Sequence, residues 1–203
     1  MSKKSPLLKI DKEEAIFEAA LKIITNKGFH KARMSDIAKQ AGISYGLIYH
    51  YFKNKESLFD TIINRWWEGL FQCFDEILGT DMPVETKLRK IVDYHLCTYQ
   101  DSPELVNIFT TEISRSTANL TKDRLDRFKK FISMTESVIA EGQQVGLLRS
   151  DYKPRYLTNI FLGALDSFIS TMVLAGQKIK GDKQRNTIAE SLLEVFLNGA
   201  KSR

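Results

Sequence analysis

Residues 42–56, GISYGLIYHYFKNKE, are the stretch that decides the fold of this 203-residue chain. Four side chains that combine a ring with a polar tip fall within seven positions: Tyr45, Tyr49, His50 and Tyr51. Each is costly to bury, because its polar atom needs a partner away from water. Lys53 and Lys55 follow directly, so this segment combines aromatic rings, polar tips and positive charge on a surface whose partner must be identified.

A helical wheel of about 100° per residue divides this segment into faces of different chemistry. Ile48 and Phe52 point the same way and are predicted to pack into a small core. The outer residues are Gly46, Leu47 and His50, with Tyr49 and Tyr51 on the two flanks, about 80° to either side of the core direction. Such a helix suits a groove, because the outer residues face its floor and the flanking hydroxyls reach its rims.

The preceding residues supply the other half of a helix-turn-helix. A short helix is predicted for MSDIAKQA, residues 34–41, in which Ala38 is small where the two helices would cross. Gly42 supplies the turn, Ile43 fills the angle and the Ser44 hydroxyl can cap the second helix. In this motif the second helix lies in the major groove of DNA. The alternative is that the tyrosines simply pack as half-buried aromatic side chains.

The charge distribution favours the same partner. The net charge is +5, and residues 1–55 carry 11 Lys/Arg against five Asp/Glu, whereas residues 56–203 carry 19 against 20. The positive excess therefore lies wholly in the N-terminal quarter, where it favours a polyanion, although a solvated basic face has the same composition. Lys55 adds a positive side chain to a helix N-terminus, which is a phosphate site in many proteins. Two interpretations stay open for Lys3, Lys4 and Lys9: a solvated tail, or an arm along the DNA backbone.

The rest of the chain is predicted to be helical as well. Apolar spacing, prolines and glycines predict further helices at residues 12–27, 55–78, 84–100, 104–113, 122–145, 155–175 and 184–200. Asp11 is the expected N-cap of the first of them. The sequence therefore predicts an all-α fold of about nine helices. We expect a DNA-binding domain at residues 1–56 and a helical ligand-binding and dimerisation domain at residues 57–203, with the boundary inside one helix.

Residues 34–59, MSDIAKQAGISYGLIYHYFKNKESLF, closely resemble the DNA-binding signature of TetR-type transcriptional repressors. With the first helix, the resemblance covers about 50 residues. It implies a homodimer that binds a palindromic operator and is released by a small ligand. It also implies DNA contacts for Ser44, Tyr45, Gly46, Leu47, Tyr49, His50 and Tyr51, with Lys55 on phosphate. The family usually has two hydroxyl residues where this chain has Ala32 and Arg33, so a helix cap is missing and Arg33 becomes a candidate phosphate contact.

Two helices of the larger domain are candidates for the dimer interface. The helix at residues 155–175 is apolar on more than one face and must therefore be covered on two sides. This helix and the final helix, together with the same two helices of a second subunit related by a two-fold axis, would form a four-helix interface. The residues expected there are Phe161, Ala164, Leu165, Ile169, Leu192, Leu193 and Phe196.

Aromatic residues and a methionine beyond the needs of an ordinary core indicate a ligand pocket. The candidates are Phe71, Phe74, Tyr94, Tyr99, Phe109, Phe128, Phe131, Met134, Phe161 and Phe168, of which half or more are expected to be simply core. Polar groups among or near them, including His95 and Asp166, could orient a ligand.

The effector class stays open between two alternatives. Residues 108–117 and 163–173 are similar to fatty-acid-degradation repressors that sense acyl-coenzyme A, a weaker similarity than that of the helix-turn-helix. The basic run KDRLDRFKK, residues 122–130, with Arg115 nearby, could bind nucleotide phosphates or be a solvated helix face. The alternative effector is a drug or aromatic compound, with an efflux or catabolic gene as the target.

Other classes of protein find little support. His95 and Cys97 diverge by about 200° on a helix and cannot form a local nucleophile–base pair, and we expect no enzyme, cofactor or metal site. A helical adaptor without a ligand is the remaining competitor. The first residues lack an apolar core of signal-peptide length, and no uninterrupted apolar run reaches about 18 residues. We expect no membrane contact and a reduced, cytoplasmic protein in which Cys73 and Cys97 are unpaired.

Overall fold

The computed structural model describes residues 6–108 and 122–200, and within these ranges every regular element is a helix. The all-α prediction is confirmed. The helices are α1 (Pro6–Lys27), α2 (Met34–Gln40), α3 (Tyr45–Tyr51), α4 (Lys55–Leu78), α5 (Val84–Asp101), α6 (Pro103–Ile108), α7 (Lys122–Gln144), α8 (Pro154–Leu174) and α9 (Gly181–Ala200). Phe109 and Arg115 lie outside the described residues, as does most of the segment 108–117.

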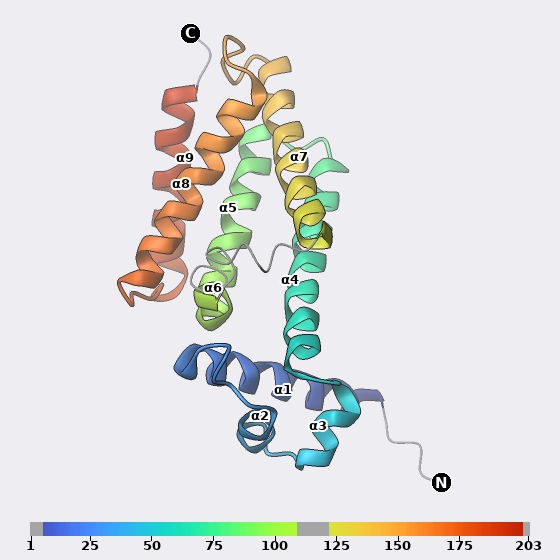
Figure 1. Cartoon of the computed structure of the whole chain (residues 1–203). Coiled ribbons are helices and arrows are strands. Elements are labelled where there is room, and N and C mark those ends of the chain that lie inside the picture. The colour runs from blue at the N-terminus through green and yellow to red at the C-terminus, as the bar shows by residue number, and fades with distance from the viewer. Residues whose placement is uncertain (1–5, 109–121, 201–203) are drawn as a thin grey trace.

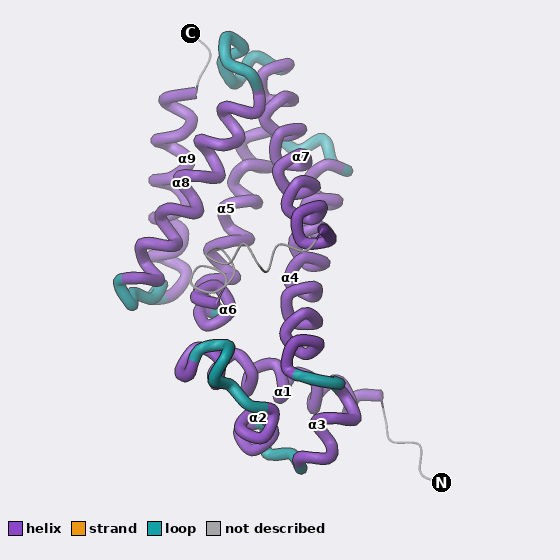
Figure 2. The backbone as a smooth tube through the Cα atoms, in the orientation of Figure 1, coloured by secondary structure: helices purple, strands orange, loops and turns teal. Residues whose placement is uncertain are grey.

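The molecule has a small end and a large end, joined by one long helix (Figure 1). Helices α1, α2 and α3 form the small end, and α4 runs from it into the larger bundle of α5 to α9 (Figures 1 and 2). Besides α4, a second connection is made where α1 contacts α6. A displacement in the bundle can therefore reach the small end by two routes.

The helix-turn-helix forms for the local reasons that its sequence predicts. Gly42 adopts φ +67, a left-handed conformation that side chains disfavour, and so ends α2. The backbone N–H of Ile43 then donates to the carbonyl oxygen of Ala38 at 3.0 Å. Ile48 is fully buried and Phe52 nearly so, and Ala38 is buried as well. The core face derived from the wheel is thus confirmed.

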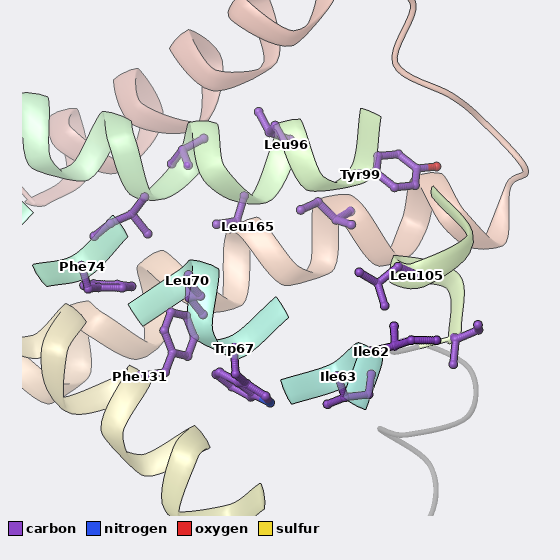
Figure 3. Packing of buried hydrophobic residues seen from close by; sticks show 14 of the residues in the cluster. Ile62, Ile63, Trp67, Leu70, Phe74, Leu96, Tyr99, Leu105, Phe131 and Leu165 are labelled. Carbon is purple, nitrogen blue, oxygen red and sulfur yellow. The ribbon is translucent and has the colours of Figure 1, made fainter. Parts of the chain in front are cut away.

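The core of the large end is built mainly by α4, α5, α7 and α8 (Figure 3). Phe74 and Leu70 of α4 are fully buried, and Phe131 of α7 packs edge-on against Phe74, with ring centroids 5.7 Å apart. An ion pair is embedded in this bundle. The Lys87 ammonium, whose residue is 3% exposed, donates to both carboxylate oxygens of Glu141 at 2.8 Å and ties α5 to α7.

Several predicted helix bounds need correction. Helix α1 begins at Pro6, so Asp11 lies inside the helix and is not its N-cap; proline is favourable in the first turn because the missing N–H has no acceptor there. Helix α9 begins at Gly181, three residues before the predicted start. Helix α8 is long and apolar enough to cross a membrane by length and composition alone. Its contacts with α7 and α9 cover part of its apolar surface, and 33% of the apolar window is buried.

Candidate nucleic-acid interface

Helix α3 presents the predicted residues on one exposed surface. Gly46 and His50 are exposed, and Leu47 and Tyr51 are partly covered at its edges. The Ser44 hydroxyl caps the helix by accepting a hydrogen bond from the Leu47 backbone N–H at 3.3 Å, as predicted from its position. A Cβ atom added at Gly46 would meet nothing within 4 Å, so the opening beside this residue belongs to the surface of the protein.

Tyr45 and Tyr49 form a pair on this surface. Tyr45 is 57% exposed and Tyr49 43% exposed, so neither belongs to the core. Their hydroxyl oxygens are 3.1 Å apart, and their rings meet edge-on with centroids 5.0 Å apart. This hydrogen bond is the main cause that raises the pKa of Tyr49. Tyr45, which the wheel leaves between core and groove, therefore belongs to the exposed surface.

Arg33 occupies the N-cap position of α2 and makes no side-chain cap. This confirms that the cap expected of the family's hydroxyl residues is absent. The Arg33 side chain is exposed and free to meet a phosphate. Nearby, the Lys27 ammonium donates to Asp36 at 2.8 Å and lowers the pKa of that carboxyl group. Lys27 is therefore paired with a carboxylate of the same chain at the surface, whereas Arg33 is available to a partner.

Lys55 is placed differently from the prediction. Its ammonium group donates to the carbonyl oxygens of Phe29 at 2.6 Å and His30 at 3.4 Å, and it lies 4.5 Å from the centroid of the Phe29 ring. The side chain therefore ties the start of α4 to the turn after α1. Asn54 and Ser57 form a reciprocal capping box at the same helix end. The predicted use of this ammonium on phosphate conflicts with the carbonyl contacts that it makes.

The large end contains an aromatic cluster where α4, α5 and α7 meet. Its members are Trp66, Trp67, Phe71, Phe74, Tyr94, His95 and Phe131. Four of the ten predicted pocket residues belong to this cluster, and Met134 packs against the core close by. Trp66 and Trp67 are missing from the predicted set, although two adjacent tryptophans in an apolar helix were a visible signal.

The remaining pocket candidates lie elsewhere, which corrects the predicted set. Tyr99 donates its hydroxyl to the Gln177 carbonyl oxygen, and Phe161 packs on Phe196 between α8 and α9. Phe128 touches the cluster only at its edge, 6.5 Å from the centroid of Phe131, and is exposed, as is Phe168 on the outer face of α8. Residue type alone predicts these four for the pocket, and residue type does not determine the direction of a side chain.

Burial changes the titration of the polar groups in the aromatic cluster. It raises the pKa of Tyr94 to about 12, and the Tyr94 hydroxyl donates to the Trp66 carbonyl oxygen at 3.2 Å. Burial also lowers the pKa of His95, so its imidazole is neutral. His95 Nδ1 lies 2.9 Å from the Ile91 carbonyl oxygen, which can only accept, so Nδ1 carries the proton. His95 Nε2 is consequently an acceptor, and the Asp166 carboxylate lies near enough to act on the imidazole electrostatically.

The basic run of α7 is largely engaged in ion pairs. Arg124 pairs with Asp60 of α4 at 2.6 Å, and Arg127 pairs with Asp123 at 3.3 Å. The Lys130 ammonium lies 4.2 Å from the centroid of the Phe71 ring, at the edge of the aromatic cluster. Most of these charges are thus explained by contacts along and between helices.

An apolar face on α8 and α9 lies open on the side away from the core. Ile160 is 60% exposed and Val195 is 76% exposed, and a groove of about 590 Å³ is lined by both and by Ala164, Phe168 and Leu192. Five of the seven residues predicted for the dimer interface are instead covered by their own subunit: Phe161, Leu165, Ile169, Leu193 and Phe196. The predicted helices carry the open face, and Ala164, Leu192 and Phe196 line its groove. The other four predicted residues are buried within their own subunit and do not line the groove.

Comparison with known proteins agrees with this geometry. The profile of bacterial regulatory proteins of the tetR family matches residues 16–62, and that of the YsiA-like protein C-terminal region matches residues 63–195. The chain belongs to the TetR family. It is 25% identical over 188 residues to the fatty acid metabolism regulator protein of Bacillus subtilis, covering 93% of this chain and 95% of that protein. It is 26% identical over 188 residues to the repressor KstR2 of Rhodococcus jostii, covering 92% and 90%.

Solved structures of TetR-family regulators superpose over nearly the whole chain. The fatty acid degradation regulator FadR of Bacillus halodurans has a TM-score of 0.76 and 26% identity, covering 100% of both chains. FadR of Bacillus subtilis, in complex with stearoyl-CoA, has a TM-score of 0.74 and 25% identity, covering 92% of this chain and 98% of that one. These proteins are regulators of transcription, so this chain is a DNA-binding transcriptional regulator and not an enzyme.

Proposed function

We propose that this TetR-family chain is a repressor that binds a palindromic operator as a homodimer and is released by an apolar effector. The observation that carries the proposal is the exposed surface of α3, where uncharged hydrogen-bonding rings surround Gly46 next to the basic N-terminal quarter. A major groove offers base edges to such a surface, and its phosphate rims accept hydrogen bonds from hydroxyl groups. Arg33 adds an exposed positive charge at the rim.

The homodimer is proposed to form through the open face of α8 and α9. A face with Ile160 and Val195 this exposed is unusual for a monomer, because apolar patches of this kind mark interaction sites. A two-fold axis would bring the same face of two subunits together, with Ala164 allowing close approach. Two recognition helices about 34–36 Å apart would then enter successive major grooves.

The proposed effector is a long-chain acyl-coenzyme A, because the two similar FadR regulators concern fatty acids and one of them is bound to stearoyl-CoA. The aromatic cluster between α4, α5 and α7 is the proposed region for its apolar part. A drug or aromatic compound is the second candidate, and Trp66 with Trp67 supports it because flat rings stack on indole.

Release is proposed to work through α4. Phe74 in the aromatic cluster and Lys55 at the DNA-binding end are 19 residues apart on this helix, or about 28 Å. A tilt of about 10° at the cluster would therefore move the other end by about 5 Å. Such a shift in each subunit changes the separation of the recognition helices. The effector can shift this separation only if it binds the protein more tightly at one separation than at the other.

The test begins with the DNA upstream of the chain's own gene. Footprinting should locate a palindrome, and its affinity should fall steeply with salt. Stearoyl-CoA should release the protein, whereas coenzyme A alone and an efflux-type aromatic cation should not. Release by the aromatic compound only would favour the second candidate. A protein without sequence preference, or one released by none of these compounds, would contradict the proposed repressor.

The dimer has its own test. Ile160→Glu should give a monomer in sedimentation velocity, because a carboxylate would be buried in the apolar face. Lys183→Glu, an exposed change in the first turn of α9, should remain dimeric. If both variants are dimers, the open face of α8 and α9 is not the interface.

A further inference from the structure

Gly69 lies in the interior of α4, the helix that joins the bundle to the DNA-binding end (Figure 1). A glycine at such a position destabilises a helix relative to alanine. The structure gives a reason for it. A Cβ atom added at Gly69 would lie 2.8 Å from the hydroxyl oxygen of Tyr94, closer than real Cβ atoms approach. The missing side chain therefore leaves the space that the Tyr94 hydroxyl occupies.

The Tyr94 hydroxyl uses this space to reach the backbone of α4. It donates to the carbonyl oxygen of Trp66 at 3.2 Å, about one helical turn before Gly69. In a regular helix that oxygen also accepts from the backbone N–H of Leu70, and its two lone pairs allow both bonds. Burial raises the pKa of Tyr94 to about 12, so the hydroxyl keeps its proton at neutral pH. Tyr94 of α5 is thus hydrogen-bonded to the middle of α4.

Tyr94 is also a member of the aromatic cluster. Its ring centroid lies 5.9 Å from that of His95, and the ring of Trp66 lies 6.4 Å from the same imidazole. One side chain therefore lines the region proposed for the effector and holds α4 at the same time. A ligand that enters this cluster needs room among these rings, and a displacement of the Tyr94 ring breaks its bond to α4.

The orientation of α4 in turn sets that of α3. Only residues 52–54 separate the two helices, and Lys55 at the start of α4 is tied to the turn after α1. Gly69 is 14 residues from Lys55, or about 21 Å along the helix. A change of angle at Gly69 therefore becomes a displacement of the DNA-binding end.

We propose that Tyr94 is a positioning residue for operator binding: its hydroxyl, lying against Gly69, holds α4 in the orientation in which α3 fits the operator. An effector in the aromatic cluster releases the DNA by displacing this hydroxyl. The second step rests on the effector region proposed above. The first step concerns only the binding of DNA, and it can be tested without an effector.

A double-mutant cycle of Tyr94→Phe and Gly69→Ala tests the first step. Operator affinity is measured by fluorescence anisotropy, on a duplex selected from a random pool and without effector. Tyr94→Phe removes the hydroxyl, and Gly69→Ala pushes it away from α4. Each should weaken binding about fivefold, the effect of one hydrogen bond between neutral groups.

The double variant separates positioning from stability. Without the hydroxyl, the nearest ring atom of residue 94 lies 3.9 Å from the added Cβ atom, which is an ordinary contact. The double variant should therefore bind the operator as Tyr94→Phe does, with no further loss. It should nevertheless melt about 3 °C higher than Tyr94→Phe, because alanine favours the helix. A hydroxyl with a merely structural role would make affinity follow stability.

Tyr99→Phe is the matched control. The Tyr99 hydroxyl also donates from α5 to a backbone carbonyl oxygen, but that oxygen belongs to Gln177 and not to α4. This variant should lower the melting temperature and leave operator affinity unchanged. An equal loss of affinity in Tyr99→Phe, additive losses in the double variant, or unchanged affinity in both single variants would overturn the inference. Tighter binding by Tyr94→Phe would do so as well, because the contact would then belong to the released arrangement.

Stearoyl-CoA distinguishes this inference from the proposed function. If it releases the wild-type protein while Tyr94→Phe and Gly69→Ala bind the operator normally, the proposed effector stands and the role of Tyr94 is wrong. If both variants are weakened as expected and stearoyl-CoA does not release the wild-type protein, Tyr94 positions α4 and the proposed effector is wrong.

Discussion

Replacing Lys55 with methionine should destabilise the fold without removing a phosphate contact. The ammonium group holds the carbonyl oxygens of Phe29 and His30, and the 3.4 Å bond is the weaker of the two. A hydrogen bond from a charged group contributes about 1.5–3 kcal/mol, and the partial exposure of this side chain reduces that figure. We therefore expect a loss of about 2 kcal/mol in the free energy of unfolding. For a chain of this length, that lowers the melting temperature by about 6 °C.

The assay measures two quantities on the same variant. Circular dichroism at 222 nm gives the melting temperature, and operator binding at a series of salt concentrations gives the slope of log K against log[salt]. Each phosphate contact that is lost lowers the magnitude of that slope by about 0.9 for each subunit. Lys55→Met should leave the slope unchanged.

Arg33→Met is the matched control for this prediction. The Arg33 side chain is exposed and makes no cap, so its removal should leave the melting temperature unchanged and lower the slope by about 0.9 for each subunit. The reasoning is refuted if the two variants behave the other way round. In that case Lys55 leaves its carbonyl partners when DNA binds and meets a phosphate instead.

Three further predictions concern separate parts of the molecule. Gly46→Glu should fold normally, because a Cβ atom at this position meets nothing within 4 Å. The variant should lose operator binding in a gel-shift assay, and normal binding would mean that α3 does not lie in the groove. Glu141→Gln removes the carboxylate that pairs with the Lys87 ammonium and should cost about 2 kcal/mol in urea unfolding, because Glu141 is partly exposed to water. This cost should exceed that of Lys87→Met, and equal costs would contradict the prediction. Burial lowers the pKa of His95 in the folded protein, so the unfolded chain binds more protons than the folded one as the pH falls. The free energy of unfolding should therefore decrease below about pH 6.5, and His95→Phe should reduce that decrease. An unchanged pH profile would contradict the buried, neutral imidazole.

The DNA-binding end could be predicted closely because its determinants are local. The bounds of α4, predicted at residues 55–78, coincide with the observed ones, and Gly42 and Ser44 make the turn and cap expected of them. A glycine that takes a positive φ and a serine at an N-cap act within a few residues, so spacing in the sequence is enough to identify them. The orientation of Ile48 follows from the same short range.

The partners of some charged side chains could not be predicted, because they lie far away in the sequence. Lys55 meets Phe29, which is 26 residues earlier in the chain, and nothing in the local spacing reports that approach. The same holds for Arg124, which pairs with Asp60 across 64 residues and so is not simply part of a solvated basic face. A positive side chain beside a basic motif has several possible partners, and only the tertiary fold decides among them.

Comparing α3 with α8 shows why one functional face could be predicted from the sequence and the other could not. On α3 the outward positions carry rings with polar tips, whereas the core position carries Ile48, so chemistry distinguishes the two faces. On α8 the residues Phe161, Leu165 and Ile169 repeat every four positions on the buried face. Ile160, Ala164 and Phe168 repeat in the same way on the open one. The two stripes are offset by one residue, about 100° on the helix, and are equally apolar. Periodicity therefore identifies α8 as a helix to be covered on two sides, and only the packing of the subunit decides which stripe is left for a partner.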